Sequence, residues 1–303
     1  MKRILVVLLC LCLLTGCGKQ RPQAVRTVFA MDTVMELKLY GQAAEASAAQ
    51  LQTLINTLEK DWSVTREDSV INDPGAEFTH QQQLLLERLE EMSRHTGGLF
   101  DMYLGGAMDA WGFYDKNYRV PTDEELSRVE RKLDLGGAMK GYCAEQAVAL
   151  LDTMDIDYAI LDLGGNIQTY KNKPDGTPWQ IGIQNPEGGA PLGILSVSGT
   201  MAVVTSGDYQ RSFTAEGRQY HHILDPRTLR PAESGLRSVT VISKSGLTAD
   251  CLSTALFVMG LEAGTGFWQE SDDFEAVFVT ADGRIYATEG AALSGCEFQV
   301  IER

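Results

Sequence analysis

Three short segments, far apart in the chain, carry the residue types that hold a diphosphate and a divalent cation. Residues 134–142 read Asp-Leu-Gly-Gly-Ala-Met-Lys-Gly-Tyr, and residues 249–254 read Ala-Asp-Cys-Leu-Ser-Thr. Between them, Ser206-Gly-Asp-Tyr leads into 221–228, His-His-Ile-Leu-Asp-Pro-Arg-Thr. Glycines let the backbone approach a ligand closely, lysine supplies positive charge, and carboxylate and hydroxyl oxygens bind hard cations. Together these segments predict a nucleotide site.

The first segment predicts a strand end, a glycine turn and the start of a helix. The free N–H groups and the positive end of such a helix attract a phosphate, and Lys140 adds a point charge there. The segment is not a Walker loop, because no Gly-Lys-Ser/Thr triplet is present, and Gly136 does not open a Gly-x-Gly-x-x-Gly motif. An ordinary glycine turn is the alternative interpretation.

The third segment offers oxygen ligands for a metal ion. Asp250 and Thr254 are four residues apart on a predicted helix and therefore share one face, with Ser253 near them. A carboxylate with hydroxyl oxygens, completed by water, phosphate or a backbone carbonyl, suits Mg²⁺. The alternative is that Asp250 lies in the first turn of its helix, where an acid interacts favourably with the dipole and needs no metal.

The middle segment holds two histidines at the end of a predicted strand, before a proline-containing turn. A histidine with a near-neutral pKa is a natural general base for a hydroxyl nucleophile, and His222 is the candidate. Asp208 and Asp225 are alternatives, and both imidazoles could instead only hold the turn together. No Gly-x-Ser-x-Gly, His-Glu-x-x-His or Cys-x-x-Cys motif occurs, which argues against hydrolase-elbow, zincin and thioredoxin chemistry.

The composition limits what the chain can bind. It has 303 residues, of which 44% are hydrophobic, enough for one or two folded domains. The formal net charge of −15 argues against nucleic acid as a partner and against a polybasic membrane patch. Because bulk charge repels an anionic ligand, a few placed cations must hold it. After the first seventeen residues the chain keeps only Cys143, Cys251 and Cys296, which form no disulfide framework.

The N-terminus has the features of a bacterial lipoprotein signal. Two basic residues precede the apolar stretch 4–14, which is too short to span a bilayer. Leu14-Thr-Gly-Cys17 resembles a lipobox, so we expect lipidation at Cys17 and a domain tethered to the extracytoplasmic side of a cell membrane. A plain secretory signal or an uncleaved anchor is the alternative. The expected divisions are a signal peptide at 1–16, a tether at 17–25 and one catalytic domain at 26–303.

Hydrophobic periodicity and capping signals predict the elements that position these segments. Helices are expected over 42–60, 82–94, 140–154 and 249–259, the last capped by Thr248 and stopped by Gly260, and a capping box of Thr122 and Glu125 starts another. Residues 27–40 are expected to form a strand or half of a hairpin, and further strands are expected over 158–163, 179–184, 194–198, 201–205, 219–224 and 238–243, with a terminal hairpin over 275–288. Helices and antiparallel-type strands mix without βαβ alternation, which predicts an α+β fold.

With these motifs in this order, the chain resembles the ApbE-like family of FAD:protein FMN transferases. The resemblance covers nearly all of the chain beyond the signal. Besides the three segments above, it rests on Phe29-Ala-Met-Asp-Thr33, Trp62-Ser-Val-Thr65, Gly98-Leu-Phe-Asp101, Trp111-Gly-Phe113, Gly164-Gly-Asn166 and Ser234-Gly-Leu-Arg-Ser-Val-Thr-Val241.

The resemblance implies an ApbE-like, T-fold-related arrangement of mixed helices and antiparallel sheets. It implies an enzyme that binds FAD with Mg²⁺, moves FMN to a threonine or serine hydroxyl of an acceptor flavoprotein, and releases AMP. The family suggests a subunit of a membrane redox complex as acceptor. The acceptor pattern of the family, Asp-Gly-x-Ser/Thr-Gly, is absent here, so the target is another protein. An FAD diphosphatase, a non-catalytic lipid-anchored flavin carrier and a structural surface lipoprotein are the alternatives.

The resemblance also implies the site residues. The FAD contacts would be Met31, Thr65, Leu99, Phe100, Asp101, Asp134, Lys140 and Leu224. The Mg²⁺ ligands would be the carbonyl of Gly137, the carboxylate of Asp250 and the hydroxyl of Thr254, with Ser253 as a weaker ligand because some members have an acid there. Thr65 stands where others carry an aromatic residue, and Leu229 stands where glycine is usual.

Overall fold

The computed structural model describes residues 23–303, so the expected signal peptide, Cys17 and most of the expected tether lie outside the described residues. The helices are α2 (Ala44–Trp62), α3 (His80–His95), α4 (Gly105–Ala110), α5 (Asp123–Ser127), α6 (Met139–Leu151), α7 (Gly246–Met259) and α8 (Leu261–Gln269), with a short 3-10 helix, η2 (Val70–Asn72). No helix within this described part is long and apolar enough to cross a bilayer.

The strands are β1 (Gln23–Ala30), β2 (Thr33–Tyr40), β3 (Tyr158–Asp162), β4 (Asn166–Tyr170), β5 (Trp179–Ile183), β6 (Gly193–Val197), β7 (Ala202–Gly207), β8 (Ser212–Ala215), β9 (Arg218–His221), β10 (Leu224–Asp225), β11 (Arg230–Pro231), β12 (Leu236–Ser243), β13 (Phe274–Thr280), β14 (Ile285–Thr288), β15 (Leu293–Ser294) and β16 (Gln299–Ile301). Nine of them form one sheet in the order β1-β2-β3-β4-β7-β12-β13-β14-β16. Neighbouring strands in this sheet are antiparallel, except that β14 and β16 are parallel. The α+β prediction is therefore confirmed.

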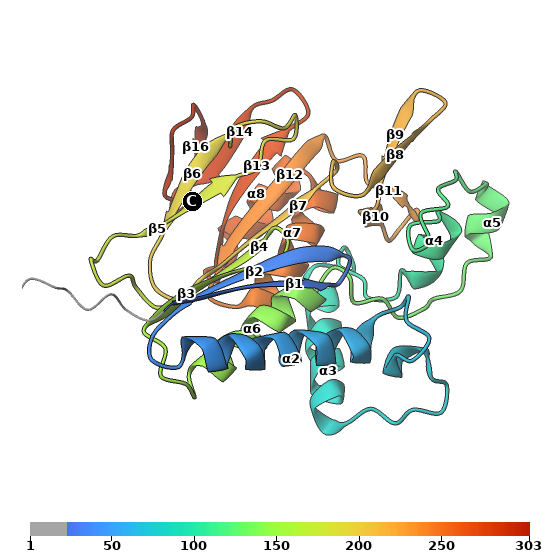
Figure 1. Ribbon diagram of the computed structural model, residues 1–303. Coiled ribbons are helices and arrows are strands. Elements are labelled where there is room, and N and C mark those ends of the chain that lie inside the picture. The colour runs from blue at the N-terminus through green and yellow to red at the C-terminus, as the bar shows by residue number, and fades with distance from the viewer. Residues whose placement is uncertain (1–22) are drawn as a thin grey trace, which may run out of the picture.

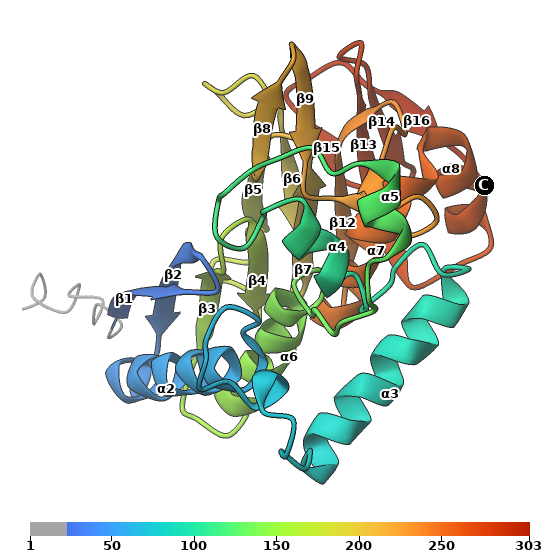
Figure 2. The ribbon, with the colours of Figure 1, turned by 90° about the vertical axis from the view of Figure 1, so that its right-hand side faces the viewer.

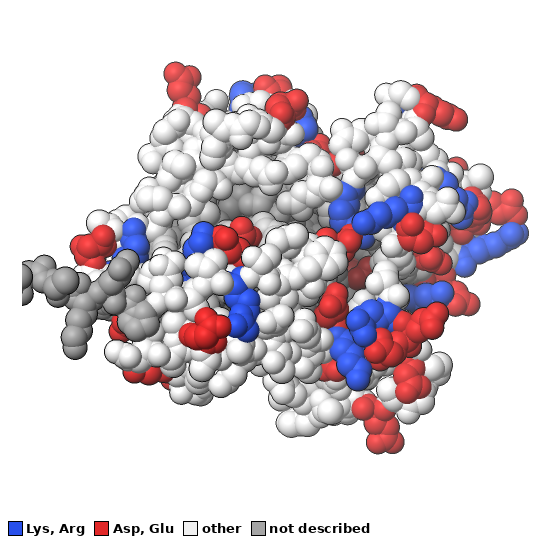
Figure 3. All heavy atoms as spheres, in the orientation of Figure 1, with Lys and Arg blue, Asp and Glu red and all other residues white. Residues whose placement is uncertain are grey.

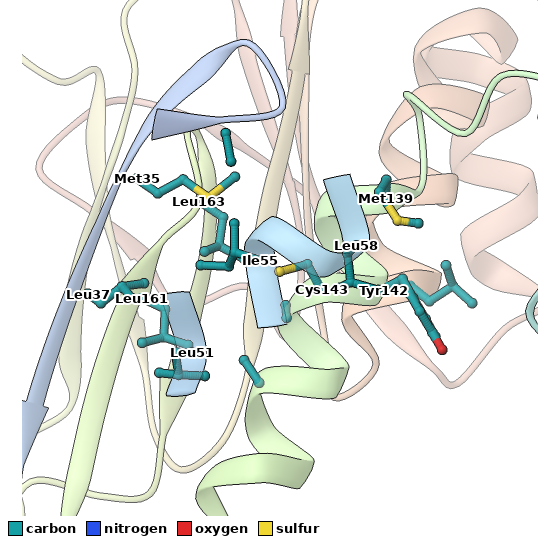
Figure 4. Packing of buried hydrophobic residues seen from close by; sticks show 14 of the residues in the cluster. Met35, Leu37, Leu51, Ile55, Leu58, Met139, Tyr142, Cys143, Leu161 and Leu163 are labelled. Carbon is teal, nitrogen blue, oxygen red and sulfur yellow. The ribbon is translucent and has the colours of Figure 1, made fainter. Parts of the chain in front are cut away.

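Helices cover one face of this sheet, and a three-stranded sheet, β15-β6-β5, covers part of the other (Figures 1 and 2). The alternation of side chains along strand β2 explains why helices cover this face. Met35, Leu37 and Leu39 alternate with more exposed residues and are fully buried against the helices. Leu51 and Ile55, four residues apart on α2, pack against this row (Figure 4).

A smaller lobe of α4, α5 and the β8–β9 hairpin projects beside the main sheet (Figure 1). It has its own hydrophobic cluster, in which the rings of Trp111 and Tyr220 lie 5.3 Å apart and those of Tyr118 and Phe213 stack at 5.0 Å. The indole N–H of Trp111 donates a hydrogen bond to the carbonyl oxygen of Leu229 at 2.8 Å. This bond ties the lobe to the turn that follows β10.

Most expected elements are present, including the Thr122 capping box and the Gly260 stop. The expected N-cap at Thr248 is wrong, because α7 starts at Gly246. Ser245 caps the helix instead, since its hydroxyl accepts the N–H of Thr248 at 3.0 Å. Glu145 of α6 supports this earlier start by accepting the N–H of Leu247 at 3.2 Å.

Other features also differ from the sequence-based expectation, and residues 27–40 are divided between β1 and β2. Strand β1 starts at Gln23, inside the expected tether, because it pairs with the whole of β2. The expected strand 219–224 is divided between β9 and β10, and the hairpin β13–β14 is followed by β15 and β16. The segment before Gly136 is not a sheet strand. An isolated bridge from Leu104 to Lys132, a bond from the Asp134 N–H to the Met102 carbonyl oxygen at 2.8 Å, and side-chain bonds of Asp134 and Arg131 hold it.

Candidate active site

A cleft of about 540 Å³ opens where the main sheet, the helices and the small lobe meet. Its walls come from the β1–β2 turn, the end of α2, the loop after α3, the start of α6, the end of β7, the foot of the β8–β9 hairpin and one face of α7. Of the residues expected to contact FAD, bind the metal or, in the case of His222, act as the base, all but Ser253 line this cleft: Met31, Thr65, Leu99, Phe100, Asp101, Asp134, Gly137, Lys140, His222, Leu224, Asp250 and Thr254.

Helices α6 and α7 cross so closely that their backbones touch. A Cβ atom added at Gly141 would lie 2.2 Å from the carbonyl oxygen of Gly246, and one at Gly246 would lie 2.5 Å from the carbonyl oxygen of Gly141. The crossing brings Asp250, which is 3% exposed, to the N-terminus of α6, where Oδ2 accepts the N–H of Gly141 at 2.7 Å. Asp250 is in the second turn of α7, so the expectation that it serves the dipole of its own helix is wrong.

The oxygens around this crossing fit a hard cation. Asp250 Oδ1 receives no hydrogen bond within residues 23–303, and Thr254 lies one turn further along the same face. A Cβ atom at Gly137 would be 3.4 Å from the Thr254 hydroxyl, so the glycine turn borders the same space. Across residues 23–303 no group of three or more His, Cys, Asp or Glu side chains could hold a metal. One carboxylate with hydroxyl and carbonyl oxygens suits Mg²⁺ and not a thiolate- or imidazole-bound metal.

Ser253 faces away from the cleft into the protein. It is fully buried, its hydroxyl donates to the Asp250 carbonyl oxygen at 2.9 Å, and it lies 2.8 Å from the hydroxyl of Ser206. Ser206 lines the cleft and also lies 3.3 Å from the Thr254 hydroxyl. At this wall of the cleft the serine hydroxyl that lines it therefore belongs to Ser206, and not to Ser253 as expected from the sequence.

Two carboxylates that line the cleft already accept hydrogen bonds from other residues of the protein. Asp134 accepts the phenolic O–H of Tyr114 at 2.6 Å and the N–H of Gly136 at 2.8 Å. Burial and the neighbouring Asp134 raise the pKa of Tyr114, so it stays a hydrogen-bond donor. Asp101 accepts two bonds from Arg131, at 2.9 and 3.0 Å. These carboxylates are therefore fixed in orientation before any ligand binds.

The two histidines have different surroundings. His222 lines the cleft, whereas His221 packs its ring on Phe257 and its Nε2 lies 3.2 Å from the Ala232 carbonyl oxygen. Burial, reinforced by the positive charges of Arg211 and Lys140 and by His221, lowers the pKa of His222 to about 3. His222 is therefore a neutral imidazole at physiological pH, and its candidacy as the base rests on its position in the cleft.

The alternative bases are not in the cleft. Asp208 is held by the guanidinium of Arg237, at 2.8 and 3.1 Å, and Asp225 is held by Arg227. The Arg227 side chain and backbone N–H lower the pKa of Asp225. Neither residue lines the cleft, so among the three candidates His222 has the best position for a base.

Sequence reasoning missed several residues of the cleft, among them Arg211, Tyr114 and Glu59. Glu59 accepts the N–H of Met31 at 2.9 Å and so holds the β1–β2 turn, in which Met31 and Asp32 have φ of 53° and 56°. Arg211 could have been found if the β8–β9 hairpin had been predicted, because its register sets Arg211 opposite His222. No local sequence signal marks Tyr114 or Glu59.

The arrangement agrees with comparisons to known proteins. A sequence profile of the ApbE family matches residues 31–278. The FAD:protein FMN transferase of Treponema pallidum is 29% identical over 95% of this chain and 93% of its own length. That of Vibrio cholerae is 31% identical over 87% of this chain and 90% of its own length. The crystal structure of the ApbE protein from Thermotoga maritima has a TM-score of 0.81 at 28% identity and covers 88% of this chain and 97% of that one. The chain therefore belongs to the ApbE family.

Proposed function

We propose that this protein transfers the FMN half of FAD to a threonine or serine hydroxyl of an acceptor flavoprotein and releases AMP, with Mg²⁺ bound at the cleft. The relatives named FAD:protein FMN transferase support the reaction. The observation that carries the proposal is the meeting of the glycine turn, Lys140, Asp250 and Thr254 in one cleft that also contains a neutral histidine.

The reaction is a displacement at the FMN phosphorus. The acceptor oxygen forms a bond to that phosphorus, the bond from phosphorus to the bridging oxygen breaks, and AMP leaves with that oxygen. The hydroxyl proton passes to the imidazole of His222. A general base contributes about 10²–10⁴-fold to a rate, so its loss slows turnover without removing the binding site.

Most of the catalysis is positioning and charge neutralisation, as phosphoryl transfer requires. Asp250, Thr254 and the Gly137 carbonyl would hold Mg²⁺, which would offset the charge of the diphosphate when bound. Lys140 lies in the first turn of α6, where the positive end of the helix dipole adds positive potential at the same place. Asp134 and Asp101, already oriented by their donors, provide fixed acceptors for hydroxyl and amine groups of FAD.

We also propose that the protein acts on the extracytoplasmic side of a membrane, anchored through Cys17. The sequence of the first seventeen residues supports this, with its basic start, apolar stretch and lipobox-like end. A membrane-bound redox subunit would be a suitable acceptor, because it would share that surface with the enzyme.

Product analysis tests the transfer. The protein is incubated with FAD, Mg²⁺ and a candidate acceptor, and the intact mass of the acceptor and the AMP released are measured. We expect the acceptor to gain the mass of FMN less one water, with one AMP released per acceptor labelled.

Two other outcomes would contradict transfer. Equal amounts of free FMN and AMP with an unlabelled acceptor would indicate an FAD diphosphatase, since the same cleft could direct water at the phosphorus. FAD binding without AMP release would indicate a flavin carrier. Incubation without acceptor and incubation with EDTA serve as controls.

A further inference from the structure

The cleft contains two cations that make no ion pair within residues 23–303, Lys140 and Arg211. Other arginines near the cleft are neutralised: Arg131 by Asp101 at 2.9 Å and Arg237 by Asp208 at 2.8 Å. A half-buried guanidinium without a counter-ion is costly unless a ligand completes it. Sequence reasoning assigned Lys140 to a phosphate and assigned nothing to Arg211.

The register of the β8–β9 hairpin places Arg211 beside the proposed base. Ser212 pairs with His221, and beyond that pair the N–H of His222 donates to the carbonyl oxygen of Arg211 at 3.0 Å. Arg211 and His222 are therefore cross-strand neighbours, whose side chains leave the ribbon on the same side. Both line the cleft.

The guanidinium of Arg211 is fixed at one end only. Its Nη2 donates to the Phe113 carbonyl oxygen at 2.9 Å, and its other N–H groups have no partner in the described part of the chain. The cleft carboxylates that could have paired with it are already engaged, Asp134 with Tyr114 and Asp101 with Arg131. One hydrogen bond thus holds the guanidinium of Arg211 in place, and its other N–H groups remain available to a ligand.

We propose that Arg211 is a catalytic residue that binds a non-bridging oxygen of the phosphate being transferred. The inference rests on the proposed function. The base must lie within hydrogen-bond reach of the attacking hydroxyl, so the attacked phosphorus lies beside His222. In FMN transfer that phosphorus belongs to FMN, and Arg211 is the cation next to His222 on the same hairpin.

In this assignment, two groups of residues neutralise different parts of the negative charge of the diphosphate. As the acceptor oxygen bonds to phosphorus and the bond to the bridging oxygen breaks, Arg211 stabilises the oxygens that stay with FMN. Lys140, the α6 N-terminus and the metal ligands lie on other elements and serve the remaining oxygens of the diphosphate. Removing one donor of this kind typically costs about 10²–10³-fold in rate.

Two substitutions and one matched control test the inference. Arg211→Gln removes the charge, and Arg211→Lys keeps the charge but loses the planar fork of donors. Arg218→Gln is the control, because Arg218 lies on the same hairpin but is exposed, pairs with Glu233 and does not line the cleft. The measurements are kcat and KM for FMN transfer, and separate dissociation constants for FMN and AMP by titration.

We expect Arg211→Gln to lower kcat about 100-fold or more. We also expect it to weaken FMN about 10-fold, with AMP binding unchanged, because the contact belongs to the FMN phosphate. Arg211→Lys should be intermediate in both, and Arg218→Gln should behave as wild type. If Arg211→Gln does not fold, kcat and the FMN and AMP dissociation constants of Arg211→Lys test the inference.

Wild-type kcat and wild-type FMN affinity in the Arg211 variants would overturn the inference, as would equal weakening of FMN and AMP. Failure of the proposed function gives a different result. In that case the wild-type protein itself releases no AMP and labels no acceptor, whereas the comparison of FMN and AMP binding still decides the role of Arg211.

Discussion

His222 combines burial with two nearby cations, and both disfavour its protonated form. Its pKa falls from 6.5 to about 3 in the folded protein. Between these values the unfolded chain binds a proton that folded His222 does not bind, so acid favours unfolding. The stabilising contribution of neutral His222 is complete above about pH 6.5 and is lost as the pH falls toward 3.

We predict that His222→Gln lowers kcat about 10²–10⁴-fold, because a base is lost. The free energy of unfolding of this variant should also fall less between neutral and mildly acidic pH than that of wild type. Denaturant unfolding at the two pH values measures this difference. The kcat/KM of the wild type should show no acid limb near 6.5, the ordinary pKa of histidine.

Asp208→Asn and Asp225→Asn separate His222 from the alternative bases. Both carboxylates are paired with arginine outside the cleft, so we expect both variants to keep kcat within a few-fold of wild type. A loss of kcat in either variant as large as that of His222→Gln would contradict the assignment of the base.

At the scale of elements, the contact of α6 with α7 places the proposed Mg²⁺ ligands Asp250 and Thr254 beside the glycine turn. Gly141 and Gly246 leave no room for a side chain between the helices, and only this close approach lets Asp250 reach the N–H of Gly141. The buried carboxylate and the start of α6 are therefore set by helix packing and not by a loop. A site built in this way has little freedom to adjust.

We predict that Gly141→Ala separates the two helices and lowers the free energy of unfolding by roughly 1–3 kcal/mol, the usual cost of overpacking. It should also weaken divalent-cation binding, because Asp250 moves away from the turn at Gly137. Gly266→Ala on α8 is the control, since a Cβ atom there meets nothing within 4 Å. That change should stabilise the protein by roughly 0.5–1 kcal/mol. Unfolding curves for Gly141→Ala that match wild type would contradict the packing argument.

The turn at Leu229 shows how tertiary contacts override a local preference. The residue is a leucine where the family usually has glycine, and it still adopts a left-handed φ of 57°. Its N–H donates to the Asp225 carbonyl oxygen at 2.8 Å and its carbonyl oxygen accepts the indole N–H of Trp111 at 2.8 Å. Two hydrogen bonds and the attached lobe hold a conformation that leucine disfavours.

At the scale of the whole molecule, acidic and basic side chains are intermixed over the face seen in Figure 3, with no broad basic region. On this face, the net charge of −15 of the chain is not offset by a basic region that would attract anions. We expect selectivity for a dinucleotide to come from the cleft, where Lys140 and Arg211 have no ion-pair partner among residues 23–303. Distant segments of the chain meet there because the sheet places β4 beside β7 and β7 beside β12.

Local signals made much of the fold predictable. Apolar spacing and a capping box were sufficient for helices such as 42–60 and for the start at Thr122. The sheet order was not predictable, because pairing of β4 with β7 depends on contacts remote in sequence. The cap at Ser245 was missed for the same reason, since Glu145 and the glycine contact between α6 and α7 fix it.

The candidate site was predictable where residues are grouped in short motifs, as for Lys140, Asp250 and Thr254. It was not predictable where a single side chain reaches the cleft from a segment without a motif. Tyr114 comes from the small lobe, and Arg211 from a hairpin whose first strand gave no clear pattern. Ser253 was expected as a weaker metal ligand, but it does not line the cleft and its hydroxyl lies beside that of Ser206, because the rotation of α7, and not spacing alone, decides which of its hydroxyls faces the cleft.

One comparison decides whether the junction of α6 and α7 is the reaction centre. FMN transfer from FAD to the acceptor is followed by intact mass for the wild type, for Asp250→Asn and for Asp152→Asn, a carboxylate at the far end of α6 that bonds Tyr170. We predict at least about a 100-fold loss of Mg²⁺-dependent transfer for Asp250→Asn and near-normal transfer for Asp152→Asn. Wild-type transfer by Asp250→Asn would contradict the assignment of the cleft as the site of catalysis.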